Sequence, residues 1–173
     1  CPYQGEVKPE AVGYVARLMK DIGVQHVGVA DTIGVGTPRA VRAAMQAALG
    51  VYDLADVSGH FHDTYGQALA NIYACLEMGI ATFDTSVAGL GGCPYAKGAT
   101  GNVATEDVLY LLQGLGIDTG IDLGKVVATG QWISGVLGRS ALARAGNAIA
   151  AKTAAQSAAG PAVACASAGA QRQ

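Results

Sequence analysis

Apolar and polar positions follow two different spacings along the first 139 residues, and each change of spacing marks a new predicted element. Over residues 8–22, apolar side chains recur every three or four positions, as on one face of a helix, and Gly23 ends the pattern. Thr37 and Pro38 form a favourable N-cap and first-turn pair, which opens a second helix that ends at Gly50. Further helices are predicted over residues 65–78, 105–115 and 122–137, and short apolar runs predict strands over residues 27–31, 56–62 and 80–87.

Single helices separate the predicted strands, and the connections are too long for hairpins. This arrangement indicates parallel pairing through right-handed crossovers, which is an α/β fold. Three strands with helices on one side form a curved open sheet with two bare edges, and such edges attract further strands. Polar groups follow the predicted strands, where α/β barrels carry their functional residues. We therefore expect about three strands and their helices from a TIM (β/α)8 barrel, and not a complete doubly wound sheet.

The periodic pattern ends after Arg139. Residues 140–173 contain fifteen alanines, with Gly160 and Pro161 in the middle and almost no large apolar side chain. A segment of this composition has helical propensity but little surface to bury. We predict a partial barrel domain over residues 1–139 and an alanine-rich low-complexity tail over residues 140–173.

Composition and charge exclude several classes of partner. The 173 residues are 51% hydrophobic and 14% charged, which is typical of a globular domain, and the net charge of -2 provides no basic field for nucleic acid. No apolar run approaches the length of roughly 18 residues that spans a bilayer, and no cationic leader precedes Cys1. We expect neither a nucleic acid nor a membrane as partner.

The four cysteines indicate a reducing compartment. Cys1, Cys75, Cys93 and Cys165 are far apart and show no CxxC spacing, so the sequence predicts neither a zinc knuckle nor a disulfide framework. We therefore expect a cytoplasmic location. Cys75 lies inside an apolar helical pattern and is predicted to be a small buried hydrophobe, and Cys1 and Cys165 have no assigned role.

A glycine-rich loop over residues 86–102 carries Cys93. Because Cys93 is flanked by glycine and followed by Pro94, packing in a helix core does not explain it. Glycines permit positive φ angles and close approach of the backbone to a ligand. The pattern favours a lid that presents a reactive thiol, and an inert buried cysteine is the alternative.

Two histidines at the end of the second predicted strand have the spacing of metal ligands. His60 and His62 are two residues apart, so in an extended chain both imidazoles point the same way. Asn102, at the end of the glycine loop, can add an amide oxygen. Two imidazoles with oxygen donors and no thiolate suit an octahedral Mg²⁺ or Mn²⁺ better than Zn²⁺. An HxH pattern is a weak indication on its own, and two ordinary polar residues at a strand end are the alternative.

Two further polar residues have a structural alternative. Asp31, at the end of the first predicted strand, is a candidate for a hydrogen bond to substrate, although an N-cap or turn role fits it almost equally well. His26 has no neighbouring candidate ligand, and we interpret it as structural.

Three segments carry a resemblance to a known family. They read SVAGLGGCPYAKGATGN over residues 86–102, HFHDTYGQALAN over residues 60–71 and GVADTIGVGTP over residues 28–38. These segments resemble those of 3-hydroxy-3-methylglutaryl-CoA lyases, and the similarity covers residues 1–139. The resemblance implies a divalent-metal-dependent retro-aldol cleavage of 3-hydroxy-3-methylglutaryl-CoA to acetyl-CoA and acetoacetate, in leucine degradation and ketone-body formation.

The resemblance also implies roles for individual residues. His60, His62 and Asn102 would ligate the cation, Cys93 would be the loop thiol that takes part in catalysis, and His60 would also take part in proton transfer. Asp31 would contact the substrate or help to orient the metal site. The implied partners are an acyl-CoA substrate and a second copy of the parent chain in a homodimer.

This sequence departs from the family pattern at its start. Members of the family carry an arginine and a metal-ligating aspartate on their first strand, and this chain begins after both. The resemblance thus implies the C-terminal portion of the barrel, which would be inactive alone. A targeting segment in the part before Cys1 would make a mitochondrial location possible.

Two other functions remain open at this point. The chain could be a non-catalytic fragment or association module that uses its open sheet edges. It could also be another metal-dependent acyl-CoA synthase or aldolase of the same superfamily, against which the cysteine loop argues.

Overall fold

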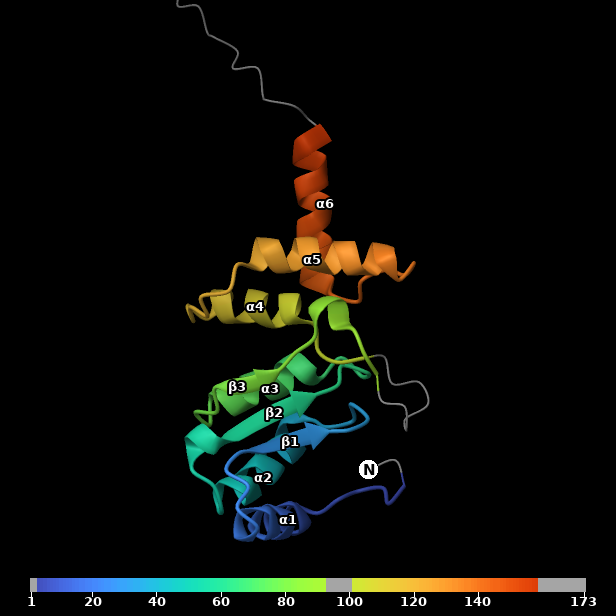
Figure 1. Ribbon diagram of the computed structural model, residues 1–173. Coiled ribbons are helices and arrows are strands. Elements are labelled where there is room, and N and C mark those ends of the chain that lie inside the picture. The colour runs from blue at the N-terminus through green and yellow to red at the C-terminus, as the bar shows by residue number, and fades with distance from the viewer. Residues whose placement is uncertain (1–2, 93–100, 159–173) are drawn as a thin grey trace, which may run out of the picture.

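A computed structural model describes residues 3–92 and 101–158 and contains a small parallel sheet with helices on one face (Figure 1). The sheet consists of β1 (Val27–Asp31), β2 (Val57–Phe61) and β3 (Thr82–Asp84). The described helices, in chain order, are α1 (Pro9–Asp21), α2 (Pro38–Leu49), the 3-10 helix η1 (Leu54–Asp56), α3 (Ala68–Leu76), the 3-10 helix η2 (Val87–Gly89), α4 (Thr105–Gly114), α5 (Leu123–Val136) and α6 (Arg144–Ala158).

The three strands pair in parallel in the order β1-β2-β3, so β1 and β3 are the two edges of the described sheet. Gly59 of the central strand pairs with Val29 on one side and Phe83 on the other, and the next residue, His60, pairs with Ala30 and Asp84 in the neighbouring row. Since successive side chains alternate between the two faces, the first row lies on the helix-covered face and the second on the opposite face. The predicted α/β class and parallel sheet are confirmed.

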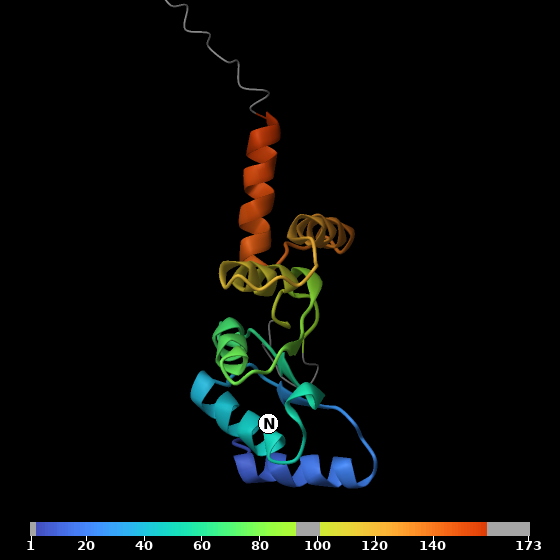
Figure 2. The ribbon, with the colours of Figure 1, turned by 90° about the vertical axis from the view of Figure 1, so that its left-hand side faces the viewer.

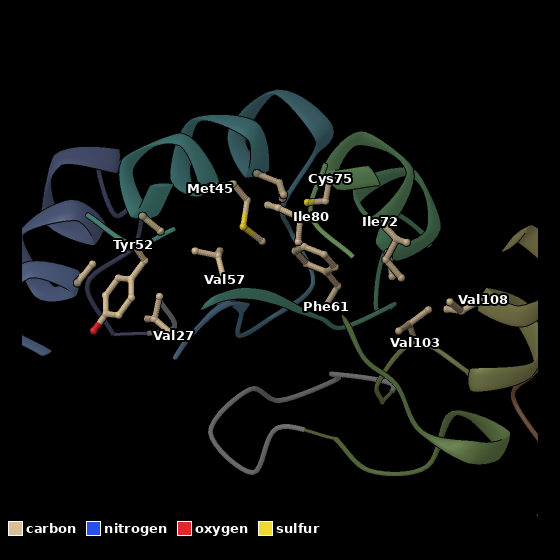
Figure 3. Packing of buried hydrophobic residues seen from close by; sticks show 14 residues of the cluster. Val27, Met45, Tyr52, Val57, Phe61, Ile72, Cys75, Ile80, Val103 and Val108 are labelled. Atoms are coloured by element: carbon tan, nitrogen blue, oxygen red, sulfur yellow. The ribbon is translucent and has the colours of Figure 1, made fainter. Parts of the chain in front are cut away.

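The core lies between the sheet and helices α2 and α3 (Figure 3). Met45 of α2, Cys75 of α3 and Phe61 of β2 are almost completely buried there. Gly59 is necessary in this layer because a side-chain carbon at its position would lie 2.8 Å from the ring of Phe61 and 3.0 Å from that of Phe83. The glycine thus lets two aromatic rings pack 6.5 Å apart, centre to centre, beneath the sheet.

The boundaries of two predicted elements differ from the structure. The predicted helix over 65–78 begins only at Ala68, because Gly66 adopts a positive φ of 69° and the Asp63 carboxylate accepts the N–H of Ala68 at 3.0 Å. The predicted strand over 80–87 contains only Thr82–Asp84, and the chain then turns into η2 after an isolated bridge between Ser86 and Ala104.

The region predicted to be an alanine-rich tail contains a helix whose last residues, 151–158, are all exposed, as expected of a segment with little to bury. Residues 144–158 form α6, which starts on α4 and α5 and extends away from the sheet (Figure 2). Ala143 is fully buried just before this helix, and at Gly146 a side-chain carbon would lie 3.2 Å from the side chain of Glu106 in α4. Small residues therefore let this helix approach its neighbours closely, a kind of packing that a count of large apolar residues does not detect.

Asp107 of α4 caps the start of α6. Its two carboxylate oxygens accept the backbone N–H groups of Arg144 at 3.1 Å and Ala145 at 2.7 Å. The first N–H groups of a helix have no partner within the helix, so the buried Asp107 supplies acceptors that α6 itself lacks.

No helix within residues 3–92 and 101–158 is long and apolar enough to cross a lipid bilayer.

We expect Asp107→Ala to destabilise the attachment of α6 by about 1–2 kcal/mol, or roughly 2–8 °C in Tm, because two helix N–H groups lose their acceptor. Thermal melting and limited proteolysis between residues 139 and 158 measure the effect. The control is Asp122→Ala, which removes one cap bond, to the Lys125 N–H at 3.0 Å, at the exposed start of α5. Equal effects of the two substitutions would contradict the role of Asp107.

Candidate metal site

His60 stands on the face of the sheet opposite the helices, near the carboxyl ends of the strands. Its neighbours across the strands are Ala30 of β1 and Asp84 of β3. The imidazole Nδ1 of His60 lies 3.2 Å from Oδ2 of Asp84, and the His60 side chain is 33% exposed. The parallel register therefore places one imidazole beside a carboxylate, with its other ring nitrogen free of that contact.

His62 follows β2 directly and lies close to His60. The centres of the two rings are 5.3 Å apart, and the rings meet edge to face at 69°. The Nδ1 atom of the buried His62 lies 2.9 Å from the backbone oxygen of Asp31. A carbonyl oxygen can only accept, so this Nδ1 carries the proton and Nε2 is the nitrogen with a free electron pair.

Asn102 reaches the same place from the far end of the glycine loop. It forms an isolated antiparallel bridge with His62, which brings the two residues side by side. Its amide nitrogen donates to the backbone oxygen of Leu90 at 3.1 Å, which fixes the orientation of the side-chain amide. The other amide atom, Oδ1, is buried and has no hydrogen-bond partner among the described residues. A buried oxygen without a partner is uncommon and fits an acceptor that is meant for a cation.

This set of donors fits a hard divalent cation. The described residues contain no group of three or more His, Cys, Asp or Glu side chains that could hold a metal. His60, His62 and Asn102 together instead offer two imidazoles and one amide oxygen, and both Nδ1 atoms are already engaged. Histidines that bind metal commonly use the second ring nitrogen in this way. Any cation at this place would need further oxygen ligands from water, substrate or other parts of a complete barrel.

The base of the glycine loop is held by a buried carboxylate. Ala88 of η2 adopts φ 58° and ψ 15°, the single positive φ of a non-glycine residue in the described part of the chain. Its N–H donates to both carboxylate oxygens of Glu106 at 3.0 Å, and the Glu106 residue is only 1% exposed. A left-handed alanine costs about 1–2 kcal/mol, which a charge-assisted hydrogen bond can offset.

Close helix packing surrounds the Glu106 carboxyl group. A side-chain carbon at Gly130 of α5 would overlap the Oε1 atom of Glu106, so only glycine lets α5 pass there. Burial raises the pKa of the Glu106 carboxyl group above its ordinary value, an effect that is opposed by the hydrogen bonds it accepts.

The side chain of Asp31 is engaged in a turn. Its Oδ2 atom accepts the N–H of Gly36 at 2.8 Å, which closes the loop after β1. The amide of the fully buried Asn71 donates to the Gly36 oxygen at 2.9 Å and holds the same loop from α3. The turn role considered for Asp31 is therefore confirmed, and its contact with substrate stays a prediction.

Cys93, the predicted catalytic thiol, lies outside the described residues, as do Cys1 and Cys165. Cys75 is fully buried in the core, and burial raises the pKa of its thiol to about 11, as expected for an unreactive cysteine. His26, whose side chain is 72% exposed, pairs with Asp56 at 3.0 Å near the amino ends of the strands, and its structural role stays a prediction.

Sequence reasoning missed two residues beside the site, Asp84 and Glu106. Asp84 ends a short strand and lies in register with His60. Aligning the predicted parallel strands would therefore have identified Asp84 as a neighbour of His60. Glu106 lies in the first turn of a predicted helix, a position where a glutamate is ordinarily exposed, so its burial could not be expected from the sequence. The missed residues orient the candidate ligands or the loop that carries them.

Comparison with known proteins gives matches over most of the chain. The HMGL-like family matches residues 1–133. A relative from Pseudomonas aeruginosa, 3-hydroxy-3-isohexenylglutaryl-CoA/hydroxy-methylglutaryl-CoA lyase, is 59% identical over 152 residues, which make up 88% of this chain and 51% of the relative. Hydroxymethylglutaryl-CoA lyases from Arabidopsis thaliana (mitochondrial) and Danio rerio (cytoplasmic) are 55% and 51% identical over 139 residues, or 80% of this chain and 30% and 42% of those relatives. The relatives thus include both mitochondrial and cytoplasmic enzymes.

Solved structures agree with the sequence matches. The crystal structure of hydroxymethylglutaryl-CoA lyase from Pseudomonas aeruginosa has a TM-score of 0.84 at 58% identity, over 88% of this chain and 51% of that chain. The structure of an HMG-CoA lyase from Acinetobacter baumannii in complex with coenzyme A and 3-methylmalate has a TM-score of 0.79 at 32% identity, over 83% of this chain and 47% of that chain. This chain spans about half the length of the Pseudomonas aeruginosa relative.

We expect the stability of Glu106→Gln relative to the original protein to increase as the pH rises from about 4 to about 8. A carboxyl group whose pKa is raised in the folded state contributes stability when protonated and loses that contribution as the pH rises, whereas glutamine does not titrate. Thermal melting of both proteins across this range measures the difference in Tm. The control for removal of a carboxyl group is Glu10→Gln on the exposed side of α1. A difference in Tm that is constant with pH would contradict the raised pKa.

Proposed function

The chain belongs to the HMGL-like family, and from this membership we propose that it is the C-terminal half of a lyase that cleaves 3-hydroxy-3-methylglutaryl-CoA to acetyl-CoA and acetoacetate. The resemblance of its loop and HxH segments to this family supports the substrate class. The relatives' names support the reaction type, and the coenzyme A complex of the related structure supports an acyl-CoA substrate.

One structural observation carries the proposal. The buried Oδ1 of Asn102 has no hydrogen-bond partner among the described residues. The backbone of Asn102 is bridged to that of His62, whose Nδ1 donates to a backbone oxygen. We assign His60, His62 and Asn102 to a divalent cation, Mg²⁺ or Mn²⁺. When bound, such a cation would supply Lewis-acid polarisation of substrate oxygens.

The reaction requires two proton movements. Cleavage of the carbon–carbon bond begins with loss of the proton of the tertiary hydroxyl group and leaves the enolate of acetyl-CoA. That carbon must then accept a proton. We assign proton transfer to His60, whose ring is partly exposed on the open face of the sheet, and protonation of the enolate carbon to the thiol of Cys93. A loop that covers the substrate would also exclude water from the enolate.

The described residues provide one part of such a site. Because the chain spans about half of its relatives, we propose that the remaining strands supply further oxygen ligands and a cationic partner for the enolate, and that this chain alone is inactive. We further propose that the complete protein is a homodimer. Leucine degradation and ketone-body formation are the processes in which such an activity would serve.

Association without catalysis is the second candidate function. A cavity of about 610 Å³ lies beside the edge strand β1 and is lined mostly by apolar side chains, among them Val12, Val29, Ile33 and Val41. An open strand edge with an apolar groove favours pairing with another chain. Size-exclusion chromatography separates the alternatives, since a compact monomer with a cooperative melt would contradict association.

The test of the lyase function uses a chimera in which the first half of the Pseudomonas aeruginosa lyase precedes this chain. We expect the chimera to release acetoacetate with Mg²⁺ or Mn²⁺ and the 173-residue chain alone to release none. Coupled enzymatic assay of acetoacetate measures both. Acetoacetate release by the chain alone would contradict the proposed half-site, and an inactive but folded chimera would contradict the lyase function.

In the same chimera, we expect His62→Ala and Cys93→Ser each to lower kcat by about 100-fold or more, through loss of a metal ligand and of a general acid, respectively. His26→Ala is the matched control, because this third histidine pairs with Asp56 at the opposite end of the sheet and should leave kcat unchanged. A near-normal rate for either site variant would remove that residue from the mechanism.

A further inference from the structure

Asp84 is an acidic side chain beside the candidate site that the proposed reaction does not use. It is the last residue of β3 and lies directly across from His60 in the parallel register. Its Oδ2 atom is 3.2 Å from Nδ1 of His60. The Asp84 side chain is 63% exposed, so neither core packing nor burial explains the contact.

The residues on either side of His60 determine which atom donates in the hydrogen bond between His60 and Asp84. On the β1 side the neighbour is Ala30, whose methyl group can neither donate nor accept, and on the β3 side it is the carboxylate of Asp84. A carboxylate accepts hydrogen bonds, so Nδ1 of His60 carries the proton and Nε2 keeps its free electron pair. The neighbouring His62 reaches the same tautomer by a different route, through the backbone oxygen of Asp31 at 2.9 Å.

We propose that Asp84 is the positioning residue for His60, which holds its imidazole as the Nδ1–H tautomer with Nε2 available to the site. The use of that Nε2 by a divalent cation rests on the proposed function, whereas the tautomer itself does not. The tautomers of both imidazoles are then set before any cation binds, that of His60 by a side chain and that of His62 by a backbone oxygen. Only the side-chain contact of His60 can be removed by a substitution.

A second histidine–carboxylate pair provides a matched control. Nδ1 of His26 lies 3.0 Å from Oδ1 of Asp56, where residues before β1 and β2 meet at the opposite end of the sheet. Asp56→Ala therefore removes a similar contact from a histidine that has no place in the site.

The chain contains three histidines, so long-range ¹H–¹⁵N NMR of the imidazole nitrogens can follow all of them in the metal-free protein. At about pH 9, where an ordinary imidazole is neutral, we expect the original chain to carry the His60 proton on Nδ1. In Asp84→Ala we expect His60 to move toward the Nε2–H form that a free imidazole favours in water, with His62 unchanged. Asp56→Ala should change His26 and leave His60 as it was.

Titration of the chimera with Mn²⁺ alone, followed by electron paramagnetic resonance, gives a second readout. We expect about 10-fold weaker binding in Asp84→Ala and unchanged binding in Asp56→Ala, with Tm nearly equal in all three proteins. A His60 proton on Nε2 in the original chain, or a His60 tautomer that is unaffected by Asp84→Ala, would overturn the proposal.

Absence of Mn²⁺ binding by the chimera would count against the proposed metal set, and the tautomer would then decide the role of Asp84 alone. Failure of the metal site and failure of the positioning role are therefore distinguishable.

Discussion

The parallel register of β1, β2 and β3 is the constraint on which the candidate site depends. It fixes Ala30, His60 and Asp84 in one row on the face that the helices leave open. In the same pleat, Gly59 turns to the opposite face and makes room for the rings of Phe61 and Phe83. A shift of one residue in β2 would exchange these faces, placing His60 in the core and Phe61 in the site. The packing of the core and the placement of the imidazole are thus set by the same hydrogen bonds.

The sequence predicted the elements of the sheet layer well, because each has a local cause. The 3.6-residue pattern of α1, the Thr37-Pro38 start of α2 and the apolar run of β1 are all visible within a few residues. The attachment of the C-terminal helix was not predicted. Helix α6 is held by the Asp107 carboxylate and by the close approach of Gly146 to Glu106, contacts that join positions far apart in the sequence. Alanine-rich composition carries no information on such contacts.

The same distinction applies to the site. His60, His62 and Asn102 could be selected from residue type and spacing, and the structure brings them together. The groups that orient them could not be selected so easily, since Asp84 and the backbone oxygen of Asp31 act across neighbouring strands. A list of candidate ligands can be obtained from local sequence, whereas the direction of each ligand atom depends on contacts between strands.

The helices beyond the sheet contribute to the site through its loop. Leu142, just before α6, donates its N–H to the oxygen of Ala88 at 3.0 Å, and Glu106 of α4 accepts the N–H of the same alanine. Two residues later in the chain, the oxygen of Leu90 receives the amide of Asn102. The first end of the loop is therefore tied to α4 and to the connection into α6, and the Asn102 side chain is tied in turn to that first end. Among the described residues, β1 and β3 likewise provide the contacts of the two imidazoles, so each of the three candidate donors has an orienting contact within this chain.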